Sequence, residues 1–557
     1  MSAGVETRAL TCRYDGRERP ALEDVSLRLG AGTLTLVMGA TGAGKTTLAS
    51  CLARIVPCFT PATVSGEVRL GDQLVSDRTV GDLAGTIGMV FQDFEAQLFS
   101  TDVTQEVVFG LEQMGVPPAR MPERIAAALG AVGLTGFEGR DPTTLSGGEK
   151  QRLAIAGLLA LEPDILVLDE PTTDLDPVGR REVLGVLDGA TARGRTVVLV
   201  EHDTVAAERA DLVVLLQSGR VIAAGPPALV LGDAKRCETA GVRPPDAARV
   251  FAALGLADPP LDVETAADRL RARRLVPVPP TAPDPPPRAR EPLVRIEHVT
   301  HRYGDGREAL RDVSLTVGRG DLLALVGRNG SGKTTLAKHM NGLLAPTDGR
   351  VLLAGTDIAT LSLEGVAGRV GFVFQDPDHQ LFAATVADEV AFGPRNLGLA
   401  ADEVAARVDE ALAAVGLADR SADPFLLDKG ARQRLAVASV LAMRPETLVL
   451  DEPTTGLDHP EQVRMLELLR ALNAAGRTIV IITHTPWVIA EYAERVVLLA
   501  QGRIGYDGPV RGFFADPALV AHASFRAPDV TRLGQAFGCT PLTVEELLAW
   551  MPRGGRS

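Results

Sequence analysis

The chain contains 557 residues, and 57 Lys or Arg against 71 Asp or Glu give it a formal net charge of −14. At this length we expect about three to five domains, and the acidic balance argues against broad binding to nucleic-acid phosphates. No apolar run reaches the ~20 residues of a membrane span, and the N-terminal segment lacks a signal-peptide core, so another chain is expected to supply any span. The 5 cysteines are scattered without a CxxC pair, which argues against a disulfide framework and a zinc or iron–sulfur site and favours a reducing cytoplasm.

The sequence repeats itself at the scale of a domain. LTLVMGATGAGKTTLA (34–49) returns as LALVGRNGSGKTTLA (323–337), and VRPPDAARVFAALG (242–255) returns as FRAPDVTRLGQAFG (525–538). Because the second pair lies far beyond the first, each copy includes its own C-terminal segment. A whole domain with a helical tail is therefore predicted to be duplicated in tandem.

Short apolar runs alternate with longer helical patterns in both copies. LTLVM (34–38) and TLVLD (447–451) are continuously apolar, as is typical of parallel strands that are buried on both faces. Residues 122–133 and 401–416 have helical composition. This alternation predicts an α/β fold.

Each half contains one glycine-rich segment of the form G-x-x-x-x-G-K-[ST], placed between a predicted strand and a predicted helix. In such a loop the backbone amides face a polyphosphate, the lysine reaches the β- and γ-phosphates, and the first threonine hydroxyl ligates Mg²⁺. ATP and Mg²⁺ are thus the expected ligands. The candidate residues are Gly39, Thr41, Gly42, Gly44, Lys45, Thr46 and Thr47, and in the second half Gly327, Asn329, Gly330, Gly332, Lys333, Thr334 and Thr335.

Acidic pairs close a later apolar strand in each half, and a histidine follows the next strand at the same offset. The aspartate of each pair suits Mg²⁺, and the glutamate is placed to orient or deprotonate water. The recurrence of the histidine favours a functional role over a structural one. The predicted residues are Asp169, Glu170 and His202, and Asp451, Glu452 and His484.

LSGGEKQR (145–152) resembles the signature motif of the ABC ATPase family, and the resemblance covers residues 5–235 and 293–515. It implies that the two halves pair head to tail within the chain, so that each ATP lies between one P-loop and the signature of the other half. Ser146, Gly147 and Gly148 would then offer a hydroxyl and amides to phosphate. The resemblance further implies that Tyr14 and Tyr303 stack on adenine and that Gln92 and Gln375 sense Mg²⁺ and a transmembrane partner. It also implies that Asp176 and Asp458 are the D-loop aspartates, and that His202 and His484 are the switch histidines that contact the γ-phosphate.

The predicted fold class is therefore α/β, with tandem P-loop NTPase (ABC ATPase) domains, each with a mostly parallel sheet, a helical subdomain and a short C-terminal helical tail. Between the halves, 8 of 18 positions are proline, which predicts a semi-rigid polyproline II tether. The predicted boundaries are 1–235 and 236–274 for the first ATPase domain and its tail, 275–292 for the linker, and 293–515 and 516–557 for the second domain and its tail.

The second signature departs from the family pattern. It reads LDKGARQR (427–434), so Asp428 stands where Ser146 stands in the first half. A carboxylate that faces a γ-phosphate is repulsive unless Lys429 or Mg²⁺ compensates. We therefore predict two unequal hydrolytic centres. The stronger centre comprises Lys333, Asp451 and Glu452 with Ser146, Gly147 and Gly148. The weaker centre comprises Lys45, Asp169 and Glu170 with Gly430.

The segments after Gln92 and Gln375 indicate which type of ABC ATPase the chain resembles. VFQDPDHQLFAATVADEVAFGP (373–394) is similar to the energy-coupling factor (ECF) type of ABC ATPase, and 90–111 keeps this form more loosely, with Phe94 in place of the proline. This implies a subunit that energises uptake of a vitamin or a cobalt or nickel ion. Its implied partners are a transmembrane scaffold subunit and a substrate-binding membrane protein at the cytoplasmic face of the cell membrane.

Other members of the family share these motifs. A fused ATPase of a sugar or peptide importer is an open alternative, and a soluble ABC ATPase that acts on ribosomes is disfavoured by the proline-rich linker and the acidic charge. A DNA-repair ATPase would need a coiled-coil insertion, for which the interval between Lys45 and Ser146 leaves no room. The transported substrate does not follow from the chain, because the ATPase does not touch it.

Overall fold

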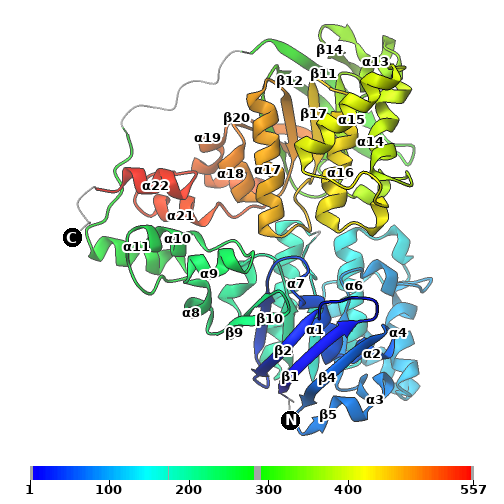
Figure 1. The fold of residues 1–557 in the computed structure, drawn as a ribbon, viewed down its shortest axis with the longest axis vertical. Helices are drawn as coiled ribbons and strands as arrows, with labels where there is room; N and C mark the ends of the chain where they lie inside the picture. Colours follow the sequence, from blue (N-terminus) through cyan, green and yellow to red (C-terminus); the bar gives the residue numbers. More distant parts are fainter. Residues whose placement is uncertain (1–3, 174, 281–289, 553–557) are drawn as a thin grey trace. The chain divides into compact units, whose positions relative to one another are not determined.

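The computed structural model describes residues 4–173, 175–280 and 290–552. Residues 281–289 of the predicted proline-rich linker, and the outermost residues of the first domain and the last tail, lie outside the described residues. The chain divides into two compact units, a first that runs to Arg269 and takes in Asp458–Pro460, and a second that comprises Leu270–Leu457 and the chain from Glu461 onward. Each unit is coloured along the sequence in Figure 1.

The first unit contains two sheets. The larger has the order β10-β9-β3-β8-β7-β6, in which only β10 pairs antiparallel, and the smaller is antiparallel with the order β2-β1-β4-β5. The larger sheet comprises β3 (Leu34–Met38), β6 (Ile87–Val90), β7 (Ile165–Asp169), β8 (Thr196–Val200), β9 (Leu212–Gln217) and β10 (Arg220–Gly225). The smaller comprises β1 (Val5–Tyr14), β2 (Leu22–Leu29), β4 (Ala62–Leu70) and β5 (Gln73–Leu74).

The second unit repeats this arrangement. Its sheets have the orders β16-β17-β18-β13-β19-β20 and β12-β11-β14-β15. The larger comprises β13 (Leu322–Val326), β16 (Val370–Val373), β17 (Thr447–Asp451), β18 (Thr478–Ile482), β19 (Arg495–Ala500) and β20 (Arg503–Pro509). The smaller comprises β11 (Pro292–Arg302), β12 (Glu308–Gly318), β14 (Asp348–Leu353) and β15 (Thr356–Asp357). The predicted pair of mostly parallel α/β domains is confirmed.

The apolar runs form central strands because both faces of each larger sheet are covered. Every residue of β3, β7 and β8 is buried. Leu36 packs into the core on the helical side, whereas its neighbour Val37 packs into the core beside the antiparallel sheet. Successive side chains of a strand point to opposite faces, so a strand between two cores has to be apolar at every position.

A cluster of three helices forms one side of each unit. In the first unit α4 (Val103–Gln113), α5 (Met121–Ala131) and α6 (Gly147–Ala160) pack together, and in the second α14 (Val386–Asn396), α15 (Ala401–Val415) and α16 (Lys429–Leu441) do the same (Figure 1). The remaining helices of the ATPase cores are α1 (Lys45–Leu52), α2 (Ile55–Cys58), α3 (Val80–Leu83), α7 (Pro177–Ala192), α12 (Lys333–Met340), α13 (Leu363–Ala367), α17 (His459–Ala474) and α18 (Pro486–Tyr492).

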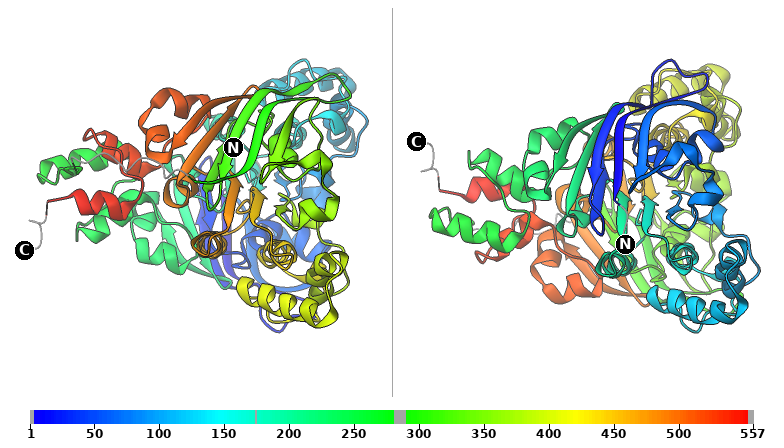
Figure 2. Two further views of the ribbon diagram at one scale, coloured as in Figure 1. Left: turned by 90° about the horizontal axis from the view of Figure 1, so that it is seen from above. Right: turned by 90° about the horizontal axis from the view of Figure 1, so that it is seen from below.

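Short helices follow the last strand of each unit. After β10 come α8 (Pro227–Leu231), α9 (Ala234–Thr239), α10 (Asp246–Ala253) and α11 (Val263–Ala272), and after β20 come α19 (Val510–Ala515), α20 (Pro517–His522), α21 (Asp529–Gln535) and α22 (Val544–Trp550). Figure 2 shows α10 and α11, in green, to one side of the blue strands of the first unit. β11 begins at Pro292, which is the last residue of the range predicted for the linker. Proline is tolerated at the first residue of a strand.

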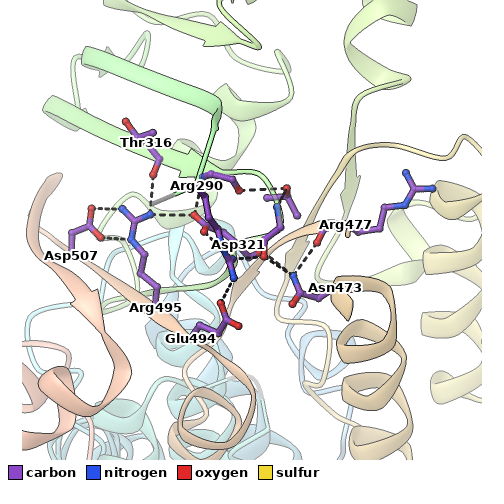
Figure 3. Close-up of polar contacts among 11 residues, drawn as sticks. Arg290, Thr316, Asp321, Asn473, Arg477, Glu494, Arg495 and Asp507 are labelled. Atoms are coloured by element: carbon purple, nitrogen blue, oxygen red, sulfur yellow. Dashed lines mark hydrogen bonds and ion pairs between the residues drawn. The ribbon is translucent and has the colours of Figure 1, made fainter. Parts of the chain in front are cut away.

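An ionic network joins Arg290, at the end of the linker, to the start of β13 (Figure 3). Asp321 is the centre of this network, because its carboxylate accepts from Arg290 Nη1 at 3.0 Å and from Arg495 Nη1 at 3.2 Å. Arg290 Nη2 also bonds Glu494 Oε2 at 2.7 Å, and Arg495 makes two bonds of 2.6 Å to Asp507. Asp321 is buried, so it compensates two guanidinium groups at a place that water reaches poorly.

We expect Asp321→Asn to destabilise the second unit by on the order of 2 kcal/mol, because it removes the buried partner that the two arginines share and leaves them only the more exposed Glu494 and Asp507. The matched control is Glu291→Gln, whose exposed pair with Arg319 should contribute no more than about 1 kcal/mol. Thermal unfolding of the full chain measures both. Equal unfolding temperatures for the two variants would contradict the role given to Asp321.

Candidate functional site

The glycine-rich loops connect β3 to α1 and β13 to α12. Gly39 and Gly44 have φ of 155° and 102°, and a Cβ atom on Gly44 would lie 2.5 Å from the carbonyl oxygen of Ala21. Gly327 and Gly332 repeat this with φ of 148° and 103°. Only glycine takes these angles without strain, and no side chain fits where the neighbouring backbone approaches so closely. Each loop therefore leaves its backbone accessible and ends at the N-terminus of a helix, where the backbone N–H groups favour an anion.

A lysine ammonium donates hydrogen bonds to backbone carbonyl oxygens of each glycine-rich loop. Lys45 Nζ donates to the carbonyl oxygens of Gly39 at 2.9 Å and Ala40 at 3.0 Å, and Lys333 Nζ donates to those of Gly327 at 2.8 Å and Arg328 at 3.0 Å. Burial lowers the pKa of Lys45, and the nearby carboxylates of Glu170 and Asp169 oppose this effect. The ammonium is thus held at the loop by oxygen atoms that a phosphate could replace.

The acidic pairs lie at the carboxyl ends of β7 and β17. Asp451 Oδ2 accepts a hydrogen bond of 2.7 Å from the hydroxyl of Thr334, the residue that follows the loop lysine. Burial raises the pKa of Asp169 to about 6, and the nearby Thr46 hydroxyl opposes this rise. In both units a buried carboxylate and a threonine hydroxyl meet beside the glycine loop.

The glutamates and histidines predicted for hydrolysis meet within each unit. His202 Nε2 lies 2.5 Å from Glu170 Oε1, and Gln92 Nε2 donates to Glu170 Oε2 at 3.0 Å. In the second unit His484 Nδ1 lies 2.8 Å from Glu452 Oε1. Each glutamate follows one strand, β7 or β17, and is oriented by a histidine that follows the next strand, β8 or β18.

The predicted adenine-stacking tyrosines are anchored to the helices that follow the loops. The Tyr14 hydroxyl lies 3.2 Å from Thr47 Oγ1, and the Tyr303 hydroxyl lies 2.9 Å from Thr335 Oγ1. These contacts place each aromatic ring beside its own phosphate loop. The structure therefore brings each tyrosine together with the loop of the same unit.

Equivalent buried positions behind the two tyrosines hold different chemistry, which the sequence reasoning missed. In the first unit they are Cys12 and Cys51, whose buried thiols shift each other's pKa, lowering that of Cys12 and raising that of Cys51. In the second unit they are His301 and His339, whose ring centroids are 4.8 Å apart. Aligning the two repeats would have revealed this paired exchange, but it would not have shown that the partners touch.

The two signature segments begin α6 and α16. Ser146 and Glu149 form a capping box, in which each side chain accepts a hydrogen bond from the backbone N–H of the other residue. In the second unit Asp428 Oδ1 accepts from the backbone N–H of Ala431 at 2.7 Å. Asp428 therefore caps its helix as Ser146 does, although it adds a negative charge. Gly147, Gly148 and Gly430 lie in the first turns of these helices, and no described hydrogen bond joins them to the glycine loop of their own unit.

Another buried carboxyl lies in the first unit and was not among the predicted site residues. Glu201 lies directly after the last residue of β8 and immediately before His202, and it is 3% exposed. Its counterpart in the second unit is Thr483. A glutamate beside the switch histidine in only one copy was the available sequence signal.

Comparisons with known proteins agree on one family. A family model described as ABC transporter matches residues 22–173 and 310–455. A protein of Caldanaerobacter subterraneus subsp. tengcongensis, whose name describes it as an ABC transporter ATP-binding protein, is 42% identical over 98% of both chains. One from Methanosarcina acetivorans with the same description is 41% identical over 96% of this chain and 90% of its own. Among solved structures, cbiO1 of Clostridium perfringens, part of the ABC transporter complex cbiONQ, is 35% identical, covers 45% of this chain and all of its own, and has a TM-score of 0.39.

Replacing either glutamate with glutamine tests the predicted inequality of the two centres. Loss of a general base costs about 10²- to 10⁴-fold in rate, and we expect Glu452→Gln to lower ATP turnover of the assembled complex much more than Glu170→Gln. Each variant should still bind ATP, because the glycine loop and its lysine are unchanged. Steady-state phosphate release measures the effect, and equal losses in the two variants would rule out the inequality.

Proposed function

Since this chain belongs to the ABC transporter family and hydrolyses ATP, we propose that it powers an ECF-type importer of a vitamin or a cobalt or nickel ion. In this role it binds, at the cytoplasmic face of the cell membrane, a separately encoded scaffold subunit that carries a substrate-binding membrane protein. Among the described residues, no helix is both long enough and apolar enough to cross a membrane. The observation that carries the proposal is a pair of exposed phenylalanines that follows Gln92 in the first half and Gln375 in the second.

The two phenylalanine pairs are built in the same way. Phe382 and Phe392 are 58% and 47% exposed, and Phe99 and Phe109 are 63% and 43% exposed. Within each pair the rings meet edge to face with centroids 4.7 Å apart. Contact between these apolar rings and water is unfavourable, and it is removed only when a binding partner covers the rings. Aromatic side chains of this kind are the usual anchors of protein interfaces.

A glutamate carboxylate holds each pair in place, and it is buried in the second unit and half-buried in the first. Glu389 Oε2 accepts from the backbone N–H of Phe382 at 2.9 Å and of Ala383 at 2.8 Å. In the first unit Glu106 Oε2 accepts from the N–H of Phe99 at 3.1 Å and of Ser100 at 2.9 Å. A rigid exposed anchor loses little conformational entropy on binding. These contacts support a preformed seat for a short apolar helix of the scaffold.

Magnesium fits the oxygen atoms beside each glycine loop. Hard cations prefer carboxylate, hydroxyl and amide oxygens, and a hydroxyl and a carboxylate meet here, with the Thr334 hydroxyl 2.7 Å from Asp451. We assign the ion to Thr46, Asp169 and Gln92 in the first half and to Thr334, Asp451 and Gln375 in the second. Bound there, Mg²⁺ would supply positive charge to the phosphates.

The proposed hydrolytic steps use side chains of this chain. Lys333 exchanges its bonds to backbone carbonyls for bonds to the phosphates and so offsets charge that develops on them. Glu452, held by His484, accepts a hydrogen bond from the attacking water and orients it. His484 keeps its other ring nitrogen for the γ-phosphate. Catalysis is then a matter of position and charge, as expected for phosphoryl transfer.

Co-purification with the membrane proteins, followed by reconstitution in vesicles, tests the proposal. We expect Lys333→Ala to abolish ATP hydrolysis and ATP-driven uptake, because no other group would replace the ammonium at the phosphates. Recovery of a permease pair with a periplasmic-type binding protein would instead identify a sugar or peptide importer. Transport near the wild-type level in the variant would contradict the assignment altogether.

The phenylalanine pairs allow a separate test of the docking surface. The double variants Phe382→Ala/Phe392→Ala and Phe99→Ala/Phe109→Ala should lower capture of the membrane subunits at least tenfold, with ATP binding unchanged, because losing one large aromatic anchor commonly costs about 2 kcal/mol or more. The controls are Leu363→Ala and Phe59→Ala, which remove apolar side chains that are even more exposed, elsewhere in each unit. Capture that is unaffected by both double variants would refute this surface.

A further inference from the structure

Glu201 occupies a buried position between two functional segments of the first unit. Its Oε1 accepts hydrogen bonds from the Thr172 hydroxyl at 2.6 Å and from the Thr172 backbone N–H at 3.1 Å. Thr172 is itself buried and lies two residues beyond Glu170. Through this one carboxyl oxygen, the turn that carries Glu170 is fastened to the segment that carries His202.

The charges around Glu201 favour a neutral carboxyl. The groups that interact with it are the carboxylates of Asp203 and Glu170, the guanidinium of Arg180, which pairs with Asp203, and the ammonium of Lys45. Burial, followed by the charge of Asp203, raises the pKa of Glu201 to about 8, and the effect of Arg180 is smaller and opposite. Near neutral pH most of this carboxyl carries its proton.

The second unit has no titratable group at this place. Thr483 takes the position of Glu201, and its hydroxyl accepts from the backbone N–H of Thr485 at 3.1 Å. Thr454, the counterpart of Thr172, is buried as well. The two centres therefore share the same backbone frame, but only the first has an acid at this position.

We propose that Glu201 is a positioning residue of the first ATP centre, which holds the turn of Glu170 through Thr172 and must be protonated for nucleotide to bind tightly. This inference rests on ATP binding by the first half, which the family establishes, and not on the proposed role in transport. The phosphates of ATP bring further negative charge to a site that already contains two carboxylates. An ionised Glu201 would oppose them, so binding takes up a proton whenever the free protein has lost it.

The sign of the pH dependence follows from this linkage. Below about pH 8 the carboxyl is already protonated and ATP affinity should not change with pH through this group. Above that pH, affinity should fall by up to about tenfold for each pH unit, because each bound nucleotide then requires one proton from solvent. Replacing Glu201 with glutamine keeps the hydrogen-bond acceptor and removes the titration.

The full-length Lys333→Ala chain isolates the first centre, because its second loop lacks the phosphate-binding ammonium. In this chain, calorimetric titration with ATP in buffers of different ionisation enthalpy should report uptake of about half a proton near pH 8. Glu201→Gln in the same chain should take up none at this pH and should bind ATP with a flatter pH profile. No proton uptake in the parent chain, or the same profile in both chains, would overturn the proposal.

A second comparison tests the positioning role independently of charge. In Lys333→Ala chains, Glu201→Thr installs the residue of the second unit but removes the carboxyl bridge to Thr172, so ATP should bind the first centre several-fold more weakly than in Glu201→Gln. The reciprocal Thr483→Glu in a Lys45→Ala chain should confer a falling affinity at alkaline pH on the second centre. Equal ATP affinities in Glu201→Thr and Glu201→Gln would refute the bridge.

Discussion

The structure of both halves depends on one interaction, the clamping of a lysine ammonium by the carbonyl oxygens of a glycine-rich loop. Lys45 and Lys333 each bond two such oxygens between 2.8 and 3.0 Å away. The loop keeps this shape because the carbonyl of a neighbouring strand, Leu216 or Leu499, leaves no room for a side chain on the first glycine. The parallel sheet therefore fixes the loop, the loop fixes the lysine, and the acidic pairs at the ends of the adjacent strands are brought to the same edge.

The same frame holds different side chains in the two halves. The first half caps its signature helix with the neutral Ser146 and the second with the charged Asp428. Near the predicted adenine-stacking tyrosine, the first half has the thiols of Cys12 and Cys51 where the second has the imidazoles of His301 and His339. Beside the switch histidine, the first half has Glu201 where the second has Thr483. None of these exchanges alters the strand order. Duplication has thus preserved the packing that holds the phosphate loops, while the polar groups around them have diverged.

Most of the fold and the central motifs could be predicted from the sequence, because a strand buried on both faces is apolar throughout and a phosphate loop needs glycine at fixed places. LTLVM forms β3, and the helical stretch 122–133 corresponds to α5 (Met121–Ala131). What escaped prediction depends on partners that are distant in the sequence. Nothing near Glu201 indicates that Thr172 will meet it, and Cys12 gives no sign of Cys51, since a strand and a helix from different segments bring them together.

Nucleotide stoichiometry tests most directly the claim that this chain carries two separate phosphate centres, each organised by its own lysine. Calorimetric titration of the full-length chain with ATP should give two bound nucleotides per chain, one in either Lys45→Ala or Lys333→Ala, and none when both lysines are replaced. Binding of only one nucleotide by the unaltered chain, or loss of both through a single substitution, would contradict this account.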